Sequence, residues 1–587
     1  MTTSRCSAAR RMVFLAVLVV CPPLAAARSD ELVTAGAPGK IVDLPGGRGE
    51  GELLRFDDRL VPALLALAPE ESAAVADWPV APGVRRAVSL ARHEVWAEGA
   101  KVFRVDAIGR TELPRSPLVF FWGGDVEGGS RVLVTIDPWT RALTALVHGP
   151  EGVNEIARDP ADAAGRHLLA APVRPRGATW SCAQEDLAET VWLPGAAAAR
   201  SAEGRTAFVL GSLYKGILAI DTDKEYLAAF GNNTANATSY IARLVASINV
   251  MYERDLNLRL LVGTTILRTG SDPWTKTGSG ASGAQLGEFT DYWNTNFPKS
   301  GTPRSFAAFF SGKSTSGGIS GVAWVPTPGS VCGGGLDYSF NQISAGGSWQ
   351  WGDTLIVGHE IGHNMGSPHT HCYATPAPDH CYAGEACYSG ATSCPPSQTI
   401  NGVPSVTGTI MSYCHMLGGC SSSLVFHPST LSRYVGPALD TGAATGCIAL
   451  VIPPPPPPPS VSAATGFNPL TPCRLLDTRN AAGPLGGPSL GAGGVRSFVV
   501  TGVCNVPAGA VAISANVTAV NPAATGNLVV YPNGIAVPPT VSTLSFRAGR
   551  TRANNSLVYL ASDGSLLVNN NAAGALDLVL DVNGYFK

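Results

Sequence analysis

Charged residues are scarce in this sequence: they make up 14% of the 587 residues, and the formal net charge is −2. No basic tract or stripe occurs, although such a feature is what a protein uses to hold a nucleic-acid backbone. Long hydrophobic runs are scarce as well. The apolar run at 12–20 is too short to span a bilayer, and no later segment is long enough. We therefore expect neither a nucleic-acid partner nor a transmembrane segment.

The N-terminus has the composition of a signal peptide. Three arginines among the first eleven residues precede the apolar run at 12–20, and three alanines at 25–27 provide a small-residue cleavage site. The sequence thus predicts a signal peptide over 1–27 and a secreted, extracellular protein.

The thirteen cysteines include no CxxC pair, which is the spacing that structural zinc sites commonly use. Eight of them lie between Cys332 and Cys447, and two more, Cys473 and Cys504, lie near the C-terminus. Both groups are even, as disulfide pairing in an oxidising compartment requires, so we expect disulfide bonds whose pairing stays open. A second zinc site built from the cysteines after His369 is the alternative, and the missing CxxC pair disfavours it.

One stretch, which begins at His359, has the sequence HEIGHNMGSPH. On a helix, His359 and His363 lie one above the other and can bind one metal ion. Gly366 can adopt a positive φ and end the helix, so that His369 returns as a third ligand. Three neutral nitrogens leave a tetrahedral Zn²⁺ with an open fourth position, which is typical of a catalytic site. Glu360, beside the first ligand, is placed to take a proton from water at the metal.

A second motif lies downstream, where 409–413 has the sequence TIMSY. On its own, Met411 would be an ordinary core methionine, and the histidines could be incidental residues of a helix. Together, the two stretches resemble the metzincin zinc metalloproteases, in which HExxHxxGxxH is followed by a tight Met-turn beneath the zinc.

Asn364 agrees with the reprolysin-like (M12B-type) branch of the metzincins, and the abundance of Gly, Ala and Pro fits a secreted bacterial member. Two positions bear on the branch. Reprolysins usually carry Asp after the third histidine, where this chain has Thr370. The Met-x-Tyr ending at Tyr413 is similar to astacins and serralysins, in which the tyrosine can approach the metal and stabilise the tetrahedral intermediate. A packed structural tyrosine is the alternative.

The resemblance implies one catalytic Zn²⁺ ion, an α/β catalytic domain with a twisted sheet and an active-site helix, and the activity of a zinc metalloendopeptidase (EC 3.4.24-type). It assigns the zinc ligands to His359, His363 and His369, the general base to Glu360 and the Met-turn to Met411. Calcium stays open, because no residue pattern indicates a calcium site.

The region 28–204 is predicted to be a β-rich propeptide. Alternating apolar runs separated by glycine-rich turns indicate short strands, and 123–136 resembles the prodomains of reprolysin-type metzincins. Cys182 is a candidate cysteine switch, whose thiolate would fill the open zinc position. An unpaired or otherwise bonded prodomain cysteine is the alternative. Arg200 and Arg205 are candidate places for activation cleavage.

The catalytic domain is predicted at 205–449, where strand-like and helix-like segments alternate in the order of a metzincin domain. The predicted strands cover 208–220, 258–267, 306–310 and 321–325, and the predicted helices begin at Thr238 or Ser239, at Gln285, and at Asp353 or Thr354. We expect 321–325 at the edge of the sheet, where an extended peptide can bind, with an interior strand as the alternative.

Seven prolines at 453–459 predict a semi-rigid linker over 450–465. Beyond it, 466–587 alternates β-type runs with turns and is predicted to be an all-β accessory domain. Its opening at 472–479 and its close at 581–586 resemble a C-terminal module of exported bacterial proteins. Contact with a cell surface or polysaccharide is one expectation for this domain, and a passive role in folding or secretion is the other.

The chain as a whole is predicted to be a multi-domain, secreted zinc endopeptidase that hydrolyses peptide bonds of extracellular proteins. A zinc amidase acting on cell-wall peptides would use the same motif and is one alternative. An adhesin-like surface protein with an inactive protease fold is the other, which the retained Glu360 disfavours because an idle site has no chemical need for it.

Overall fold

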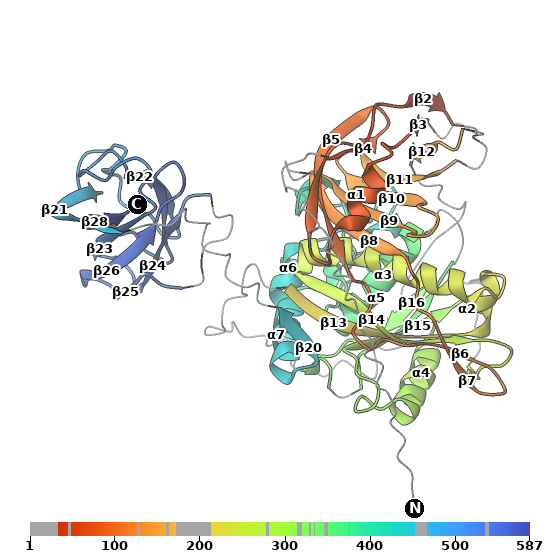
Figure 1. The fold of residues 1–587 in the computed structure, drawn as a ribbon. Helices are drawn as coiled ribbons and strands as arrows, with labels where there is room; N and C mark the ends of the chain where they lie inside the picture. Colours follow the sequence, from red (N-terminus) through yellow and green to blue (C-terminus); the bar gives the residue numbers. More distant parts are fainter. Residues whose placement is uncertain are drawn as a thin grey trace, which may run out of the picture. The chain divides into compact units, whose positions relative to one another are not determined.

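The computed structural model (Figure 1) describes residues 33–451 and 466–587, apart from 45–48, 126–128, 160–161, 163, 172–212, 277–280, 314–319, 328–329, 334, 345–349, 375, 535–538 and 540. The predicted signal peptide, Cys182, both candidate cleavage arginines and the proline run lie outside the described residues. The chain divides into two compact units, of which one comprises the described residues of 33–94 and 117–171 and the other those of 95–116 and 213–587. No helix in the described ranges is long and apolar enough to cross a membrane.

The first unit is a ten-stranded sheet that carries one helix, α1 (Leu60–Ala66). In sheet order its strands are β1 (Val33–Thr34), β4 (Ser72–Ala81), β5 (Val84–His93), β8 (Val119–Asp125), β9 (Arg131–Ile136), β10 (Leu143–Gly149), β11 (Gly152–Arg158), β12 (His167–Ala170), β3 (Glu50–Leu54) and β2 (Lys40–Asp43). All neighbouring pairs are antiparallel except β1–β4. Alternate residues of the strands pack with Leu60 and Leu64 of α1 in one core. The N-terminal region is therefore β-rich, as predicted; its role as a propeptide stays a prediction.

The second unit contains an eight-stranded sheet whose centre is parallel. In order its strands are β16 (Gly321–Ala323), β17 (Tyr338–Gln342), β15 (Phe306–Ser311), β13 (Leu213–Thr222), β14 (Leu258–Arg268), β6 (Val102–Val105) and β7 (Arg110–Leu113), with β20 (Ile448–Val451) also paired to β13. The prediction that 321–325 forms an edge strand is confirmed, because β16 ends the order and pairs with β17 alone among the described strands. The strands β6 and β7 come from within the predicted propeptide, which the sequence did not indicate.

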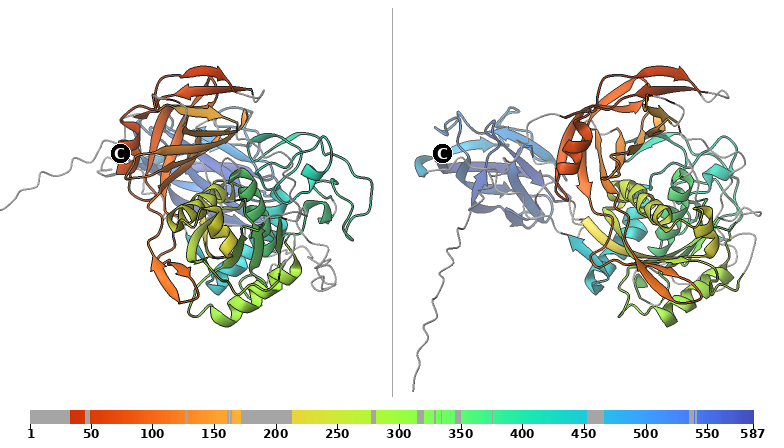
Figure 2. Two further views of the ribbon diagram at one scale, coloured as in Figure 1. Left: turned by 90° about the vertical axis from the view of Figure 1, so that its right-hand side faces the viewer. Right: turned by 45° about the vertical axis from the view of Figure 1, so that its right-hand side comes forward.

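Helices cover both faces of this sheet. Figures 1 and 2 show α3 (Thr234–Leu256) and α5 (Gln350–Asn364) on one face and α4 (Gly283–Asn296) on the other. The smaller elements of the domain are α2 (Lys224–Ala229), a 3₁₀ turn at Thr370–Cys372, the hairpin β18 (Gln398–Ile400) and β19 (Val403–Val406), a 3₁₀ turn at Cys414–Met416, α6 (Pro428–Thr430), a π-helical turn at Leu431–Val435 and α7 (Gly436–Thr445). The α/β sheet with a helix carrying the histidine motif agrees with the predicted fold class.

Two predicted helix starts are wrong by about one turn. Helix α3 begins at Thr234 rather than near Thr238, because Asn233 is the N-cap and accepts a hydrogen bond from the Asn236 amide at 3.0 Å. Thr238 is instead internal, and its hydroxyl donates to the Thr234 carbonyl oxygen at 2.7 Å. Several cap-forming residues stand in a row at this point of the sequence, so local propensity does not distinguish among them.

The start of α5 is also earlier than predicted, at Gln350, which places Asp353 and Thr354 inside the helix. Asp353 is fully buried there and accepts hydrogen bonds from the Ser344 amide, at 3.0 Å, and from the Tyr240 hydroxyl of α3. Its carboxylate therefore ties α5 to α3 instead of capping the helix.

The first strand of the domain was predicted over 208–220, but β13 continues through Asp221 to Thr222. The carboxylate is fully buried and forms an ion pair with Arg268 of β14, at 2.7 Å, and it accepts a hydrogen bond from Trp293 Nε1 of α4 at 2.8 Å. A charge that is paired in this way can remain within a buried strand.

The C-terminal region is an all-β domain, as predicted, built from two four-stranded antiparallel sheets that share one core. One sheet has the order β21 (Phe467–Asp477), β28 (Asp577–Phe586), β23 (Ala512–Val520) and β26 (Arg552–Tyr559); the other has β22 (Val495–Val499), β27 (Ser565–Asn570), β24 (Gly526–Pro532) and β25 (Leu544–Phe546). A disulfide joins Cys473 to Cys504 within it.

The eight cysteines from Cys332 to Cys447 form four disulfides, so the prediction from their even number is confirmed. The pairs are Cys332–Cys447, Cys372–Cys387, Cys381–Cys414 and Cys394–Cys420. Three of these cross-link the segment after His369, which has few regular elements. Since the sulfurs are joined to one another, these cysteines provide no thiolates for a second zinc ion.

Candidate metal centre

The histidine motif lies on the C-terminal half of α5 and in the turn that follows it. His359 and His363 are one turn apart on α5, and Gly366 has a φ of 82°, which lets the chain leave the helix. His369 then returns toward the other two, as the sequence predicted. All three side chains are buried, with relative exposures of 0%, 1% and 0%.

The Nε2 atoms of the three histidines converge on one point. They are separated by 3.0 Å between His359 and His363 and by 3.2 Å between His369 and each of the others. Zn²⁺ bonds to imidazole of about 2.0–2.1 Å at tetrahedral angles would separate the nitrogens by roughly 3.3 Å. The spacing of the three nitrogens therefore fits a single zinc ion.

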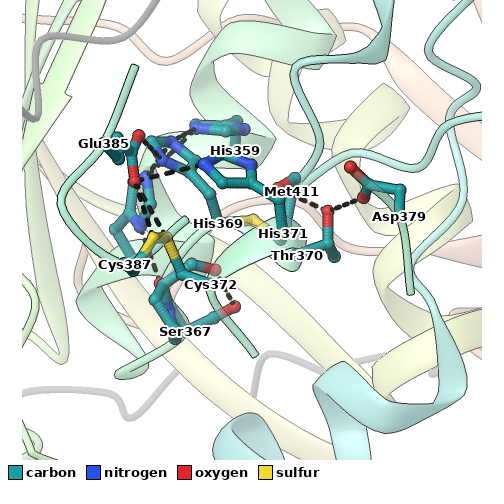
Figure 3. Close-up of polar contacts among 12 residues, drawn as sticks. His359, Ser367, His369, Thr370, His371, Cys372, Asp379, Glu385, Cys387 and Met411 are labelled. Carbon is teal, nitrogen blue, oxygen red and sulfur yellow. Dashed lines mark hydrogen bonds and ion pairs between the residues drawn. A yellow bond between two sulfur atoms is a disulfide. The ribbon is translucent and has the colours of Figure 1, made fainter. Parts of the chain in front are cut away.

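Hydrogen bonds to the opposite ring nitrogens fix the tautomers. His359 Nδ1 donates to the Ile410 carbonyl oxygen at 2.7 Å, and His363 Nδ1 donates to that of Ser367 at 2.6 Å. His369 Nδ1 donates to Glu385 Oε1 at 2.5 Å (Figure 3). Because these oxygens can only accept, each Nδ1 carries the proton and each Nε2 presents a lone pair.

Burial also keeps the three rings neutral. It lowers the pKa of His359 well below the ordinary value, that of His363 to about 3 and that of His369 below its ordinary value, and the neighbouring imidazoles contribute in the same direction. Neutral imidazole is the form that binds a metal ion. The donor set, its tautomers and its charge state thus all suit zinc.

The segment 409–413 packs against α5 and contacts the histidine cluster. Met411 is fully buried, and its sulfur lies so close to α5 that a Cβ placed on Gly362 would be 2.5 Å from it. The backbone of the same turn accepts the hydrogen bond from His359, and the Met411 carbonyl oxygen accepts one from the Thr370 amide at 2.9 Å. The turn therefore connects the first histidine to the residue after the third.

Glu360 is buried, with a relative exposure of 1%, and its carboxylate lies against the edge strand β16. A Cβ at Gly321 would come within 2.2 Å of Glu360 Oε1, so only glycine at this position leaves room for the carboxylate. The predicted general base is thus positioned between the motif helix and the strand on which an extended peptide could pair.

Tyr413 is also at the cluster. Its ring centroid lies 4.1 Å from that of His369 and 6.3 Å from that of His359, and the residue is 3% exposed. The ring of Tyr413 therefore packs on the third histidine. The other candidate for contact with the metal, Cys182, lies outside the described residues.

Sequence reasoning missed two residues beside the third histidine. Glu385 lies in no sequence motif, and His371 does not have the spacing of a ligand. Both nevertheless lie at the cluster, where the side chain of His371 is 0% exposed and that of Glu385 is 10% exposed (Figure 3). Burial on its own would raise the pKa of Glu385, but His369 and His371 lower it below the ordinary value. His380 is exposed and stacks on Tyr388, as a loop histidine would. No local pattern could have found Glu385, because its approach depends on how the cross-linked segment folds.

Thr370 occupies the position after the third histidine, where reprolysins usually carry Asp, and its side chain contacts a carboxylate from elsewhere in the chain. The hydroxyl of Thr370 donates to the carboxylate of Asp379, nine residues further along the chain (Figure 3). Asp379 is 5% exposed. A buried carboxylate therefore lies beside position 370 even though position 370 itself is threonine.

Comparison with known proteins finds a family model that matches part of this chain. Residues 215–424 match the family model Reprolysin_5, metallo-peptidase family M12. The chain is similar to the crystal structure of metalloproteinase-II from Bacteroides fragilis, with 10% identity, coverage of 65% of this chain and 95% of that one, and a TM-score of 0.30. It is also similar to a structure of a chaperone-substrate complex, with 14% identity, coverage of 39% and 36%, and a TM-score of 0.24. No curated protein matches the chain. The segment 215–424, which holds the three histidines and the Met411 turn, is thus the part of the chain that matches the model of the metallopeptidase family M12.

Proposed function

We propose that this protein is a secreted zinc-dependent endopeptidase that hydrolyses internal peptide bonds of extracellular proteins. The observation that carries the proposal is the convergence of three buried, neutral imidazoles whose Nε2 lone pairs lie 3.0–3.2 Å apart. His359, His363 and His369 would hold the ion. When bound, Zn²⁺ polarises the scissile carbonyl and makes a water molecule more acidic.

The chain's own residues would supply the remaining steps. Glu360 takes a proton from the attacking water and delivers a proton to the leaving amine. The strand β16 (Gly321–Ala323) would hold an extended substrate by main-chain hydrogen bonds along the side that pairs with no described strand. Because main-chain groups are the same in every peptide, many sequences could be accepted. Tyr413, packed on His369, is the candidate for stabilising the oxyanion.

A substrate panel tests this proposal against its alternatives. The secreted protein, after a cut at the candidate activation site Arg200 or Arg205, would be incubated with a denatured protein and, separately, with cell-wall peptides, with and without a zinc chelator. We expect chelator-sensitive cleavage of the denatured protein, and sequencing the new N-termini would show internal bonds. Cleavage of the cell-wall peptides alone would favour the amidase. A zinc-loaded protein that cleaves neither would favour the adhesin-like alternative.

A further inference from the structure

The three candidate ligands differ in what holds their second ring nitrogen. For His359 and His363 the acceptor is a backbone carbonyl, whereas for His369 it is the carboxylate of Glu385. A carbonyl fixes the tautomer and orientation of an imidazole. A carboxylate does this too, and its negative charge also makes the opposite nitrogen a stronger donor to a metal.

The carboxylate of Glu385 is itself held from several sides. Its side chain is 10% exposed, Oε1 lies 2.5 Å from His369 Nδ1, and Oε2 lies 3.3 Å from His371 Nε2. His371 is 2% exposed and its ring stacks on that of His369 with centroids 5.5 Å apart. The buried imidazoles of His369 and His371 thus both contact the carboxylate of Glu385. Of these two rings, that of His369 faces the other candidate ligands.

The backbone around Glu385 is fixed by a covalent link. The disulfide Cys372–Cys387 connects the turn just after His369 to the residue two positions beyond Glu385. The Tyr388 amide also donates to the Glu385 carbonyl oxygen at 3.0 Å, which closes a turn. The carboxylate is therefore presented to His369 by a short cross-linked loop rather than by a free side chain on the surface.

We propose that Glu385 is the positioning residue of the metal centre, which orients His369 and strengthens its bond to zinc through the Nδ1–H···Oε1 contact. This inference rests on the proposed function, since it presumes that the three histidines bind zinc. Outer carboxylates of this kind typically change metal affinity by about 10–100-fold when they are replaced. His371 would in turn keep Glu385 in place.

The test is the zinc affinity of the full-length, metal-stripped protein, measured by competition with a chromophoric chelator. We expect Glu385→Ala to weaken zinc binding by about 10–100-fold. Glu385→Gln keeps the shape and a hydrogen-bond acceptor but loses the charge, so its affinity should fall between those of Glu385→Ala and the wild type. Asp223→Asn is the matched control: Asp223 is fully buried in the same domain, where it accepts from the Tyr226 and Gly312 amides, and it contacts no candidate ligand.

The melting temperature separates positioning from general stability. The zinc-induced rise in Tm should be smaller in both Glu385 variants than in the wild type, whereas Asp223→Asn should lower the Tm of the zinc-free and zinc-loaded forms alike. Wild-type zinc affinity in Glu385→Ala would overturn this inference and leave the proposed function standing. Failure of the wild type to bind zinc would overturn both.

A separate observation concerns the strand pair β6–β7. Strand β6 lies parallel to β14, and the Val262, Thr265 and Thr269 amides donate to carbonyl oxygens of 95–105 at 2.7, 2.8 and 2.9 Å. Val102 is fully buried in this position. Without β6, the eleven residues of β14 would have an open edge in the middle of the chain's metallopeptidase region.

We infer from this pairing that residues 95–116 are a permanent part of the metallopeptidase domain, which stays bound after a cut anywhere between 172 and 212. In the full-length protein, a specific protease site placed at 200–205 would be cut and the product run on a gel-filtration column. We expect the two fragments to elute together in native buffer and apart in denaturant.

Two aspartate substitutions in β6 show whether the strand is responsible. Val102→Asp buries a charge against β14 and should release the N-terminal fragment after the cut, whereas Arg104→Asp changes an exposed residue of the same strand and should not. The inference would be overturned if the two fragments of the protein without either aspartate substitution separated in native buffer. It would also be overturned if the two fragments of Val102→Asp eluted together.

Discussion

Glu360→Gln is expected to lower kcat for peptide hydrolysis by about 10²–10⁴-fold, the range that general acid–base groups contribute. The amide has the size of the carboxylate, so it should fit the same space against Gly321 and leave the histidines in place. It cannot accept the proton of the attacking water, however. Zinc content, measured by elemental analysis, should therefore equal that of the wild type while the rate falls.

The control for this variant is the same chemical change outside the centre. Glu288→Gln alters a carboxylate of α4 that binds Thr275 and the Lys276 amide and touches none of the histidines, so its kcat should stay near the wild-type value. If Glu360→Gln kept most of its rate at full zinc occupancy, another group would have to be the base. If it lost zinc as well, its effect would be structural and the assignment would fail.

The parts of the site that the sequence predicted are those set by local geometry. His359 and His363 are four residues apart on a helix, which places them on one face whatever the rest of the chain does. The return of His369 needs only a residue that tolerates a positive φ, and Gly366 supplies it. The spacing of these residues is therefore visible without a structure.

The parts that were missed depend on distant contacts. Glu385 reaches His369 from sixteen residues away through a loop shaped by a disulfide, and no periodicity marks it. Strand β6 pairs with β14 across more than one hundred and fifty residues of sequence, and a short apolar run does not reveal its partner. Asp353 is a residue type that commonly caps the N-terminus of a helix, but here its carboxylate accepts a hydrogen bond from Tyr240 of another helix. In each case a tertiary contact overrides the local signal.

Substitution of one candidate zinc ligand should abolish both zinc binding and hydrolysis. In His363→Ala two imidazoles remain, and the fully buried space left by the ring offers no nitrogen at the point where the three Nε2 atoms meet. We therefore expect no detectable chelator-sensitive activity and no rise in Tm when zinc is added. In the wild type, zinc at about 1,000 times its Kd should stabilise the fold by about 4 kcal/mol, because it binds only the folded chain.

The matched control for this loss is His380→Ala, which removes an exposed histidine of the same region that stacks on Tyr388. Its activity and zinc-dependent Tm shift should match those of the wild type. The outcome that would count against the three-histidine centre is zinc-dependent hydrolysis in His363→Ala at the wild-type rate. In that case the ion would have to be held elsewhere, and the close approach of the three nitrogens would need another cause. If the control also lost its zinc response, the region would tolerate no histidine change, and the loss in His363→Ala would no longer identify a ligand.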